Sequence, residues 1–269
     1  MDKKPRLGQN FLVDADACRQ VVAALGNIAD DVVLEIGPGR GAITRRLARA
    51  AGHLTLIEFD TVLAAALQAE FSATPTVEVR HADILTLDLG ALAQERGRKL
   101  TVVGNLPYYI TSDILLHLVR HHAAIDRAVL MVQREVAERV TASPGTRDYG
   151  LLSATMQLYG TVELLFTLPP TAFAPPPDVY SSVFRFHVQP RFAQPQFKEL
   201  GITAEAFIPF LRASFAQKRK TWANNLRSAG YKAPAIAAAL KAAGLDASVR
   251  AEAVDLAHMA RVFQALTHS

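Results

Sequence analysis

Residues that could present an aromatic amine form the tetrad Asn105-Leu106-Pro107-Tyr108, directly after the apolar run LTVVG at 100–104. An Asn amide oxygen can accept a hydrogen bond from an amino group on an aromatic ring. A Pro fixes φ near about −65° and has no N–H to donate, so neighbouring carbonyl groups are held facing outward. A Tyr offers a flat ring on which a base can stack. The tetrad therefore predicts a site for the exocyclic amine of a purine, and a structural Pro turn with a core Tyr is the alternative.

Three glycines follow an earlier apolar run, in the segment EIGPGRG at 35–41. Closely spaced glycines let the backbone approach a ligand. Dinucleotide enzymes use the spacing GxGxxG, whereas Gly37, Gly39 and Gly41 are one residue tighter and Pro38 lacks an N–H for a phosphate. The segment favours a nucleoside that carries an amino acid, such as S-adenosylmethionine. A structural turn before a helix is the alternative.

Two acids stand at the ends of the next two apolar runs, Glu58 and Asp83. A carboxylate at the end of the second strand of such a sheet can accept both ribose hydroxyls. One at the end of the third strand could accept from the adenine amine of the cofactor. Asp60 competes with Glu58 for the ribose role, and each acid alone could be a solvated strand end.

These residues together predict transfer of a methyl group from a sulfonium to a purine nitrogen. Hydrogen bonds to the Asn105 oxygen and to a backbone carbonyl near Leu106 would make the amine more nucleophilic, and positioning would supply much of the acceleration. Tyr108 would hold the extruded base by stacking. Phe173, between prolines in the loop TAFAP at 171–175, either clamps the other face of the base or covers the edge of the core.

The elements that position these residues alternate between strands and helices in the first part of the chain. Apolar runs predict strands at 32–36, 54–57, 77–80, 100–104, 128–132, 161–168 and 181–188, and the intervening segments predict helices at 14–25, 42–50, 61–71, 112–121 and 133–141. We therefore expect a doubly wound α/β sheet, mostly parallel with a late antiparallel strand. Beyond 190 only helical patterns follow, at 204–216, 219–229, 234–243 and 256–267. The predicted domains are residues 1–190 and a small helical domain, 191–269.

Charge is distributed unevenly in the helical part. No acidic residue occurs from Ala206 through Leu245. The stretch contains seven basic residues, among them Lys232 and Lys241. The other five are predicted to bind the RNA backbone: Arg212, Lys218, Arg219, Lys220 and Arg227. Lys3, Lys4 and Arg6 could extend this surface, and a solvated helical face is the alternative reading.

Bulk composition excludes several classes of protein. The chain has 269 residues, 50% of them hydrophobic, and a net charge of +4. Cys18 is the only cysteine, so no internal disulfide can form, which fits a reducing compartment. No apolar run is long enough for a membrane span, and no signal peptide is recognisable. We expect a cytoplasmic monomer without a metal site.

The chain resembles the ribosomal RNA adenine dimethyltransferase family in long blocks: LGQNFLVD at 7–14, LEIGPGRGAIT at 34–44, GNLPYYITSDIL at 104–115, MVQREVAERV at 131–140, FAPPPDVYSSV at 173–183 and FAQKRKTWANNL at 215–226. The resemblance implies transfer of two methyl groups from S-adenosylmethionine to N6 of each of two adjacent adenosines. These lie in the 3′-terminal hairpin of 16S rRNA, in a partly assembled small subunit late in assembly. It also implies cofactor contacts at Asn10, Leu12, Gly37, Glu58, Asp83 and Asn105, and the glycine-rich turn adds Gly39 to these predicted contacts.

Three positions depart from the pattern of that family. Asp178 stands where Lys is usual, Tyr109 where Asn is usual and Trp222 where Leu is usual, so that Trp222 is either a stacking or a packing group. The rival functions are an Erm-type methyltransferase of 23S rRNA, a DNA adenine methyltransferase, and a non-catalytic RNA-binding assembly factor on the same fold.

Overall fold

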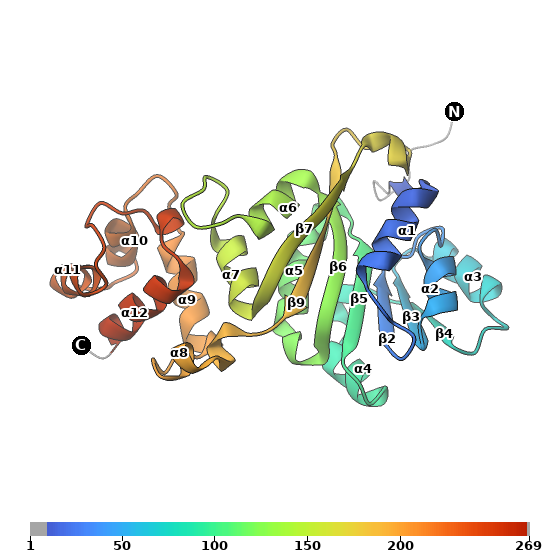
Figure 1. Ribbon diagram of the computed structural model, residues 1–269, viewed down its shortest axis with the longest axis horizontal. Coiled ribbons are helices and arrows are strands. Elements are labelled where there is room, and N and C mark those ends of the chain that lie inside the picture. Colours follow the sequence, from blue (N-terminus) through green and yellow to red (C-terminus); the bar gives the residue numbers. More distant parts are fainter. Residues whose placement is uncertain (1–9, 268–269) are drawn as a thin grey trace. The chain divides into compact units, whose positions relative to one another are not determined.

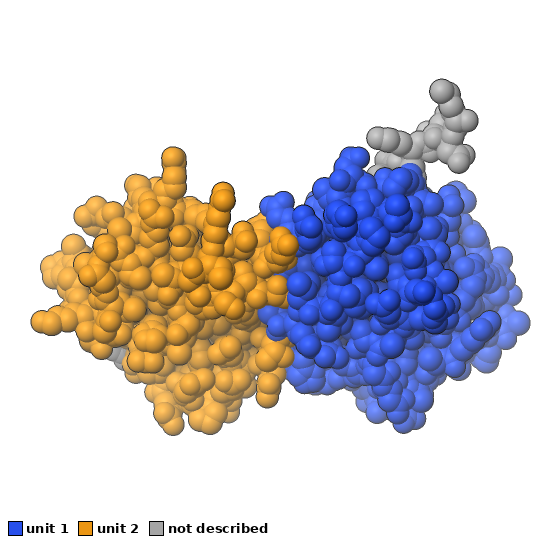
Figure 2. All heavy atoms as spheres, turned by 45° about the horizontal axis from the view of Figure 1, so that its top comes forward, with its two compact units in different colours: residues 1–137, 162–188 blue, residues 138–161, 189–269 orange. Residues whose placement is uncertain are grey.

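The chain folds into two compact units, and the computed structural model describes residues 10–267 (Figures 1 and 2). The first unit comprises the residues up to 137 together with 162–188, and the second comprises 138–161 together with those from 189 onward. The chain passes from the first unit to the second between residues 188 and 189. This point lies next to the predicted domain boundary at 190/191. Residues 138–161, however, were predicted to be in the first domain and lie in the second unit. Lys3, Lys4 and Arg6 fall outside the described residues.

A seven-stranded sheet has the order β4-β3-β2-β5-β6-β9-β7. Its strands are β2 Val32–Ile36, β3 His53–Glu58, β4 Val77–His81, β5 Leu100–Asn105, β6 Ile125–Gln133, β7 Gly160–Leu168 and β9 Ser181–Val188. The pairs from β4 across to β6 are parallel, and β9 runs antiparallel to β6. The predicted fold class is confirmed. The strand order reverses between β2 and β5, and ligands bind at the carboxyl ends of the strands at such a point.

Helices cover both faces of the sheet (Figure 1). They are α1 Ala15–Ala24, α2 Thr44–Ala50, α3 Thr61–Glu70, α4 Leu89–Glu95, α5 Thr111–Arg120 and α6 Arg134–Thr141. Val33, Leu54 and Leu56 pack with α1, α2 and α3 in one hydrophobic core. All five residues of β2 are buried, as expected where a parallel sheet is covered on both sides.

The start of the described chain is anchored to the Pro-rich loop. The two-residue strand β1, Phe11–Leu12, pairs antiparallel with β8, Phe173–Ala174. The Asp14 carboxylate then accepts from the backbone N–H groups of Asp16 and Ala17, each at 2.8 Å, and caps α1 as predicted. This anchoring brings Asn10 to the carboxyl end of β5, where its carbonyl group contacts Asn105.

The second unit is helical and has an aromatic core. Its helices are α7 Leu151–Tyr159, α8 Pro195–Lys198, α9 Ala204–Ser214, α10 Trp222–Ser228, α11 Ala233–Ala242 and α12 Leu256–Thr267. The Phe210 ring lies 6.0 Å from Trp222 and 5.1 Å from Phe263 between centroids. Trp222 is fully buried and its Nε1 donates to Ser214 Oγ at 2.8 Å. Of the two roles that the sequence left open, Trp222 therefore has the packing role.

None of the helices between residues 10 and 267 combines the length and apolar character that crossing a bilayer requires.

Candidate active site

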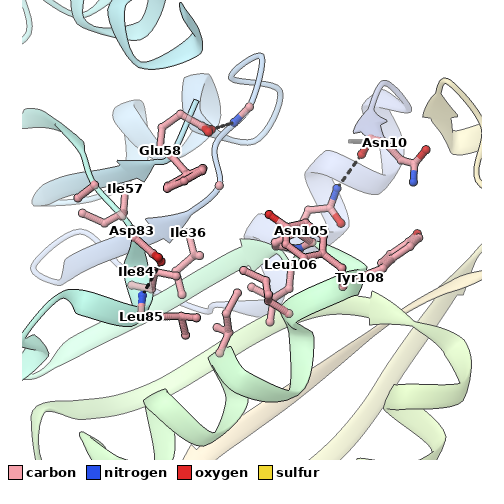
Figure 3. A pocket seen from close by; sticks show the side chains of 18 of the residues that line it. Asn10, Ile36, Ile57, Glu58, Asp83, Ile84, Leu85, Asn105, Leu106 and Tyr108 are labelled. Atoms are coloured by element: carbon pink, nitrogen blue, oxygen red, sulfur yellow. Dashed lines mark hydrogen bonds between the residues drawn. The ribbon is translucent and has the colours of Figure 1, made fainter. Parts of the chain in front are cut away.

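A cavity of about 420 Å³ opens at the carboxyl ends of β2, β3 and β5, beside the turn that follows β4 (Figure 3). It therefore lies at the reversal of strand order. Its lining combines the predicted polar residues with apolar ones: Asn10, Phe11, Ile36, Gly37, Gly39, Ile57, Glu58, Phe59, Ala82, Asp83, Ile84, Leu85, Asn105, Leu106, Pro107, Tyr108, Tyr109, Ile110 and Ile114.

The Gly-rich turn forms one wall of the cavity. Gly37 and Gly39 have φ of 65° and 58°, in the left-handed region that favours glycine. A Cβ on Gly39 would lie 3.0 Å from Cδ1 of Phe11, so this position also lacks room for a side chain. Gly41 does not line the cavity.

Glu58 fastens this turn to the end of β3. The side chain is 3% exposed, and its Oε2 accepts from the Gly39 N–H while Oε1 accepts from the Asp60 N–H, both at 2.9 Å. Each carboxylate oxygen can accept a second hydrogen bond, so Glu58 can still take ribose hydroxyls. Asp60 instead caps α3 by accepting from Val62 and Leu63 and does not line the cavity. The geometry thus favours Glu58 of the two candidates.

Asp83 lies at the far side of the cavity, after β4. Its Oδ1 accepts from the Leu85 N–H at 2.9 Å and caps the short turn Ile84–Thr86. Its other oxygen accepts no hydrogen bond from a residue between 10 and 267. The apolar side chains of Ile57, Ile84 and Leu85 lie around it in the lining (Figure 3). One free carboxylate oxygen beside apolar walls suits the amine of a purine.

Asn105 is the last residue of β5, and its amide orientation is fixed. Its Nδ2 donates to the backbone carbonyl of Asn10 at 3.1 Å (Figure 3). A carbonyl can only accept, so the nitrogen must face Asn10. The oxygen Oδ1 is therefore turned away from Asn10 and takes no hydrogen bond from a described residue. Asn105 lines the cavity with this acceptor unused.

The backbone of Leu106 supplies a second acceptor. The Leu106 N–H donates to Met131 O at 2.9 Å, and its side chain is 1% exposed, which fixes the peptide. The Pro107 carbonyl is occupied by the Thr111 hydroxyl at 2.9 Å. The Leu106 carbonyl accepts from no described residue. Besides Asn105 Oδ1, the Leu106 carbonyl is therefore an unoccupied acceptor of the tetrad.

Tyr108 is held at its hydroxyl end. Its OH lies 2.8 Å from Ser181 Oγ, and partial burial raises the pKa of Tyr108 while that hydrogen bond opposes the shift. The ring lines the cavity in a fixed position. Tyr109 and Phe59, 62% and 56% exposed, also line it, so aromatic surface is available on both sides of β2.

Two predicted residues do not reach the cavity. Leu12 and Phe173 pair across β1 and β8 and are 5% and 3% exposed, within the hydrophobic core. Phe173 therefore fits the alternative role, covering the edge of the core. Phe11, the neighbour of Leu12, lines the cavity instead, with the Arg40 guanidinium 4.4 Å from its ring centroid.

The lining residues that the sequence did not single out are all apolar: Phe11, Ile36, Ile57, Phe59, Ala82, Ile84, Leu85, Ile110 and Ile114. Part of their signal was available, because Ile57, Phe59, Ala82 and Ile84 stand directly beside Glu58 or Asp83. The sequence pattern of an apolar residue at a strand end is the same whether its side chain faces the core or a ligand.

Glu35 lies behind the Gly-rich turn, outside the lining. It is 2% exposed, and its Oε2 has no hydrogen-bond partner among the described residues. Burial raises the pKa of Glu35 to about 8, and the Glu58 carboxylate adds to the shift. Burial therefore favours the protonated form of the Glu35 carboxyl group.

The basic residues of the second unit lie on its surface. All five that were predicted to bind RNA are exposed, and they come from α9, the following loop and α10: Arg212, Lys218, Arg219, Lys220 and Arg227. Two of them bind within the unit, since Lys218 Nζ donates to Arg147 O at 2.7 Å and Arg227 donates to Asn224 Oδ1 at 2.9 Å.

The family model described as "Ribosomal RNA adenine dimethylase" matches residues 1–268. A relative named "Ribosomal RNA small subunit methyltransferase A" from Acidobacterium capsulatum is 56% identical over 98% of this chain and 91% of its own length. The protein of the same name from Koribacter versatilis is 51% identical over 98% of this chain and 94% of its own length.

Solved structures share the architecture. The 23S rRNA methyltransferase ErmE has a TM-score of 0.74 and 26% identity, over 96% of this chain and all of that chain. A dimethyladenosine transferase from Plasmodium falciparum has a TM-score of 0.78 at 21% identity, over 94% of this chain and 95% of that chain, which shows a common fold.

Proposed function

This chain belongs to the ribosomal RNA adenine dimethylase family, and we propose that it dimethylates N6 of two adjacent adenosines in the 3′-terminal hairpin of 16S rRNA. As a member of that family it is an S-adenosylmethionine-dependent methyltransferase of ribosomal RNA. The names of its relatives support the small subunit as the substrate particle. We propose that it acts as a monomer on a partly assembled subunit, late in assembly.

The residues of the cavity fit this cofactor. Glu58 would accept the ribose hydroxyls, and the free oxygen of Asp83 would accept the adenine amine between apolar walls. Gly37, Gly39 and Asn10 would hold the amino-acid end, where backbone approaches closely and Pro38 leaves no phosphate contact. The bound cofactor supplies a methyl group on a sulfonium, which is the electrophile.

The tetrad would orient the target amine. The two N–H groups of an adenine amine would donate to Asn105 Oδ1 and to the Leu106 carbonyl, which are both unused by the described residues. These bonds withdraw the nitrogen lone pair from the ring and direct it at the methyl carbon. Transfer of the methyl group from the cofactor's sulfonium would leave a positive charge on the nitrogen, and the surplus proton would pass to solvent while Asn105 Oδ1 and the Leu106 carbonyl keep the nitrogen in place. Tyr108 stacks on the extruded base.

The same arrangement accounts for a second transfer. The monomethylated amine keeps one N–H, which either acceptor can hold, so the nitrogen can again be oriented. No strong general base is required, because the methylated nitrogen is acidic until its proton leaves. Positioning by two fixed acceptors is the main contribution of the protein.

The second unit would bind the RNA backbone. Arg212, Lys218, Arg219, Lys220 and Arg227 are exposed and lie in a stretch without acidic residues. A cationic surface of this kind suits phosphate groups and gives affinity that falls with salt. We propose residues 191–269 as the core of this RNA-binding domain.

The observation that carries the proposal is the tether from Asn105 Nδ2 to Asn10 O, which leaves Oδ1 for a substrate amine in the cavity that also contains Glu58. The test is methylation of unmethylated small subunits, large subunits and adenine-containing DNA with labelled S-adenosylmethionine. We expect label in small-subunit rRNA alone. In the Asn105→Ala variant methylation should be lost while binding to small subunits remains.

Each rival function gives a different result in that assay. Label in DNA alone would favour a DNA adenine methyltransferase. Label in large subunits alone would favour an Erm-type enzyme. ErmE and this chain have the same architecture. Binding to small subunits without label would favour a non-catalytic assembly factor. Unchanged activity of Asn105→Ala would remove Asn105 from the mechanism.

A further inference from the structure

Two exposed aromatic rings stand at the mouth of the cavity in the first unit. Seven large apolar side chains are exposed among residues 10–267, and of these Phe59 and Tyr109 also line the cavity. Single exposed apolar residues are common on protein surfaces and need no ligand. A ring that is exposed and also lines a cavity can contact a ligand that extends from the cavity into solvent.

These two rings belong to different sides of the site. Phe59 directly follows Glu58, and its backbone carbonyl lies 3.0 Å from Nε2 of His81. Phe59 is therefore on the side of the ribose carboxylate. Tyr109 directly follows the tetrad and belongs to the short 3₁₀ turn Tyr108–Ile110. Tyr109 is therefore on the side of the substrate amine.

The rings of Tyr108 and Tyr109 point in different directions. Three residues make one turn of a 3₁₀ helix, so the side chains of successive residues diverge by about 120°. The hydroxyl group of Tyr108 is held 2.8 Å from Ser181 Oγ, at the start of β9. Tyr109 is 62% exposed and makes no hydrogen bond, ion pair or ring contact with any residue between 10 and 267. Its ring is thus available to a partner other than the base that Tyr108 would hold.

The substrate supplies such a partner. The tetrad holds one amine at a time, because it offers one pair of unused acceptors, Asn105 Oδ1 and the Leu106 carbonyl. When one of two adjacent adenosines is in the cavity, the RNA backbone keeps the next base close to the mouth. That base has lost its stacking neighbour, and an aromatic side chain can stack on any base.

We propose that Tyr109 stacks on the base next to the adenosine that is being methylated. This contact keeps the RNA aligned at the mouth while one adenosine reacts, and it makes the neighbouring nucleotide part of the recognised substrate. The strand passes the mouth in one direction, so Tyr109 contacts the neighbour on one side of the target, 5′ or 3′. The proposal rests on the RNA-methylating function proposed above.

The test removes the neighbouring base and leaves the target adenosine in place. Small subunits are reconstituted with 16S rRNA in which one or the other of the two adenosines is an abasic nucleotide, and kcat/KM is measured for methylation of the remaining one. On particles with both bases, Tyr109→Ala should lower kcat/KM about 10-fold, the effect of one stacked base.

The two abasic particles should give different results. Where the abasic nucleotide is the neighbour that Tyr109 contacts, the unsubstituted chain should show the same loss, and Tyr109→Ala should add nothing to it. On the other abasic particle Tyr109→Ala should have its full effect. Such a double cycle isolates the contact between one side chain and one base.

Three further variants distinguish this contact from other effects. Tyr109→Phe keeps the ring and loses no hydrogen bond with a described residue, so kcat/KM should stay within about twofold. Tyr108→Ala removes the ring that holds the target base and should lower kcat/KM by the same factor on every particle. Leu164→Ala, which truncates an exposed side chain of β7 outside the cavity, is the control and should change nothing.

Several outcomes would overturn the proposal while the proposed function stands. They are unchanged kcat/KM in Tyr109→Ala, a loss in Tyr109→Phe as large as in Tyr109→Ala, and additive losses from the substitution and the missing base on both abasic particles. Absence of methylation of every particle by the unsubstituted chain would instead reject the proposed function, and this inference with it.

Discussion

The two units use polar groups in opposite ways. In the first, Glu58 is buried with both oxygens hydrogen-bonded, and Asn105 is held by a backbone carbonyl. In the second, Arg219 and Lys220 are exposed on a loop. Methyl transfer needs atoms at fixed positions, whereas attraction to a phosphate backbone tolerates motion and depends on charge. The comparison therefore predicts that substitutions in the first unit change turnover or stability and those in the second change affinity.

The largest expected effect concerns stability and the buried carboxyl of Glu35. Its pKa is about 8 in the folded chain, against about 4.3 when unfolded. Between these values the unfolded chain releases the proton and the folded chain retains it, so stability falls as pH rises, by up to about 1.4 kcal/mol per pH unit. In the Glu35→Gln variant this decrease of stability with rising pH should be absent.

The measurement is the free energy of unfolding by urea at pH 5 and pH 8. The gain of Glu35→Gln over the unsubstituted chain should grow between these values. Glu199→Gln, at an exposed position of the second unit, is the control and should show no such growth. A parallel pH dependence in Glu35→Gln and the unsubstituted chain would show that Glu35 is not buried as a neutral acid.

The next effect concerns the tether of Asn105. Asn105→Asp keeps an acceptor oxygen but loses the donor to Asn10 O and places a carboxylate against that carbonyl. We expect kcat to fall by about 100-fold, as when one fixed transition-state contact is lost. Methylation of small subunits at saturating cofactor gives kcat, and calorimetry with S-adenosylmethionine shows whether the cofactor still binds. A kcat within threefold of the original would mean that the tether does not position the oxygen.

Two substitutions of Tyr108 distinguish the contribution of its ring from that of its hydroxyl group. Tyr108→Ala removes the stacking surface and should lower kcat/KM for RNA by roughly 10- to 100-fold. Tyr108→Phe keeps the ring and loses only the hydrogen bond with Ser181, so a loss of about fivefold is expected. Equal losses in both variants would show that the hydroxyl, rather than the ring, matters.

The smallest effect is expected at a single exposed cation of the second unit. Arg219→Gln should raise KM for RNA a few-fold, leave kcat unchanged, and reduce the slope of log affinity against log salt by about 1. Binding of labelled RNA from low to high salt measures the slope, with Lys198→Gln as the matched control. A change in kcat without a change in the salt slope would contradict the prediction that substitutions in the second unit change affinity rather than turnover.

Much of the site could be predicted because its parts are local in sequence. The alternation of apolar runs predicted β2 and β9 to the residue, and the acids and the tetrad stand at the ends of β3, β4 and β5. By contrast, α7 was missed because most of its residues are buried, so it lacks the one-sided apolar pattern of a surface helix. That helix lies in segment 138–161, which was predicted to be in the other domain.

The sequence by itself determined which segments are strands and where chemistry-bearing residues end them, because backbone conformation follows short-range pattern and glycine content. Only the tertiary structure decided which neighbour faces the cavity: Glu58 rather than Asp60, and Phe11 rather than Leu12. The pairing of β1 with β8 joins residues more than 150 positions apart and buries Phe173 in the core. A choice of side-chain direction of this kind depends on packing between distant segments, which no local spacing records.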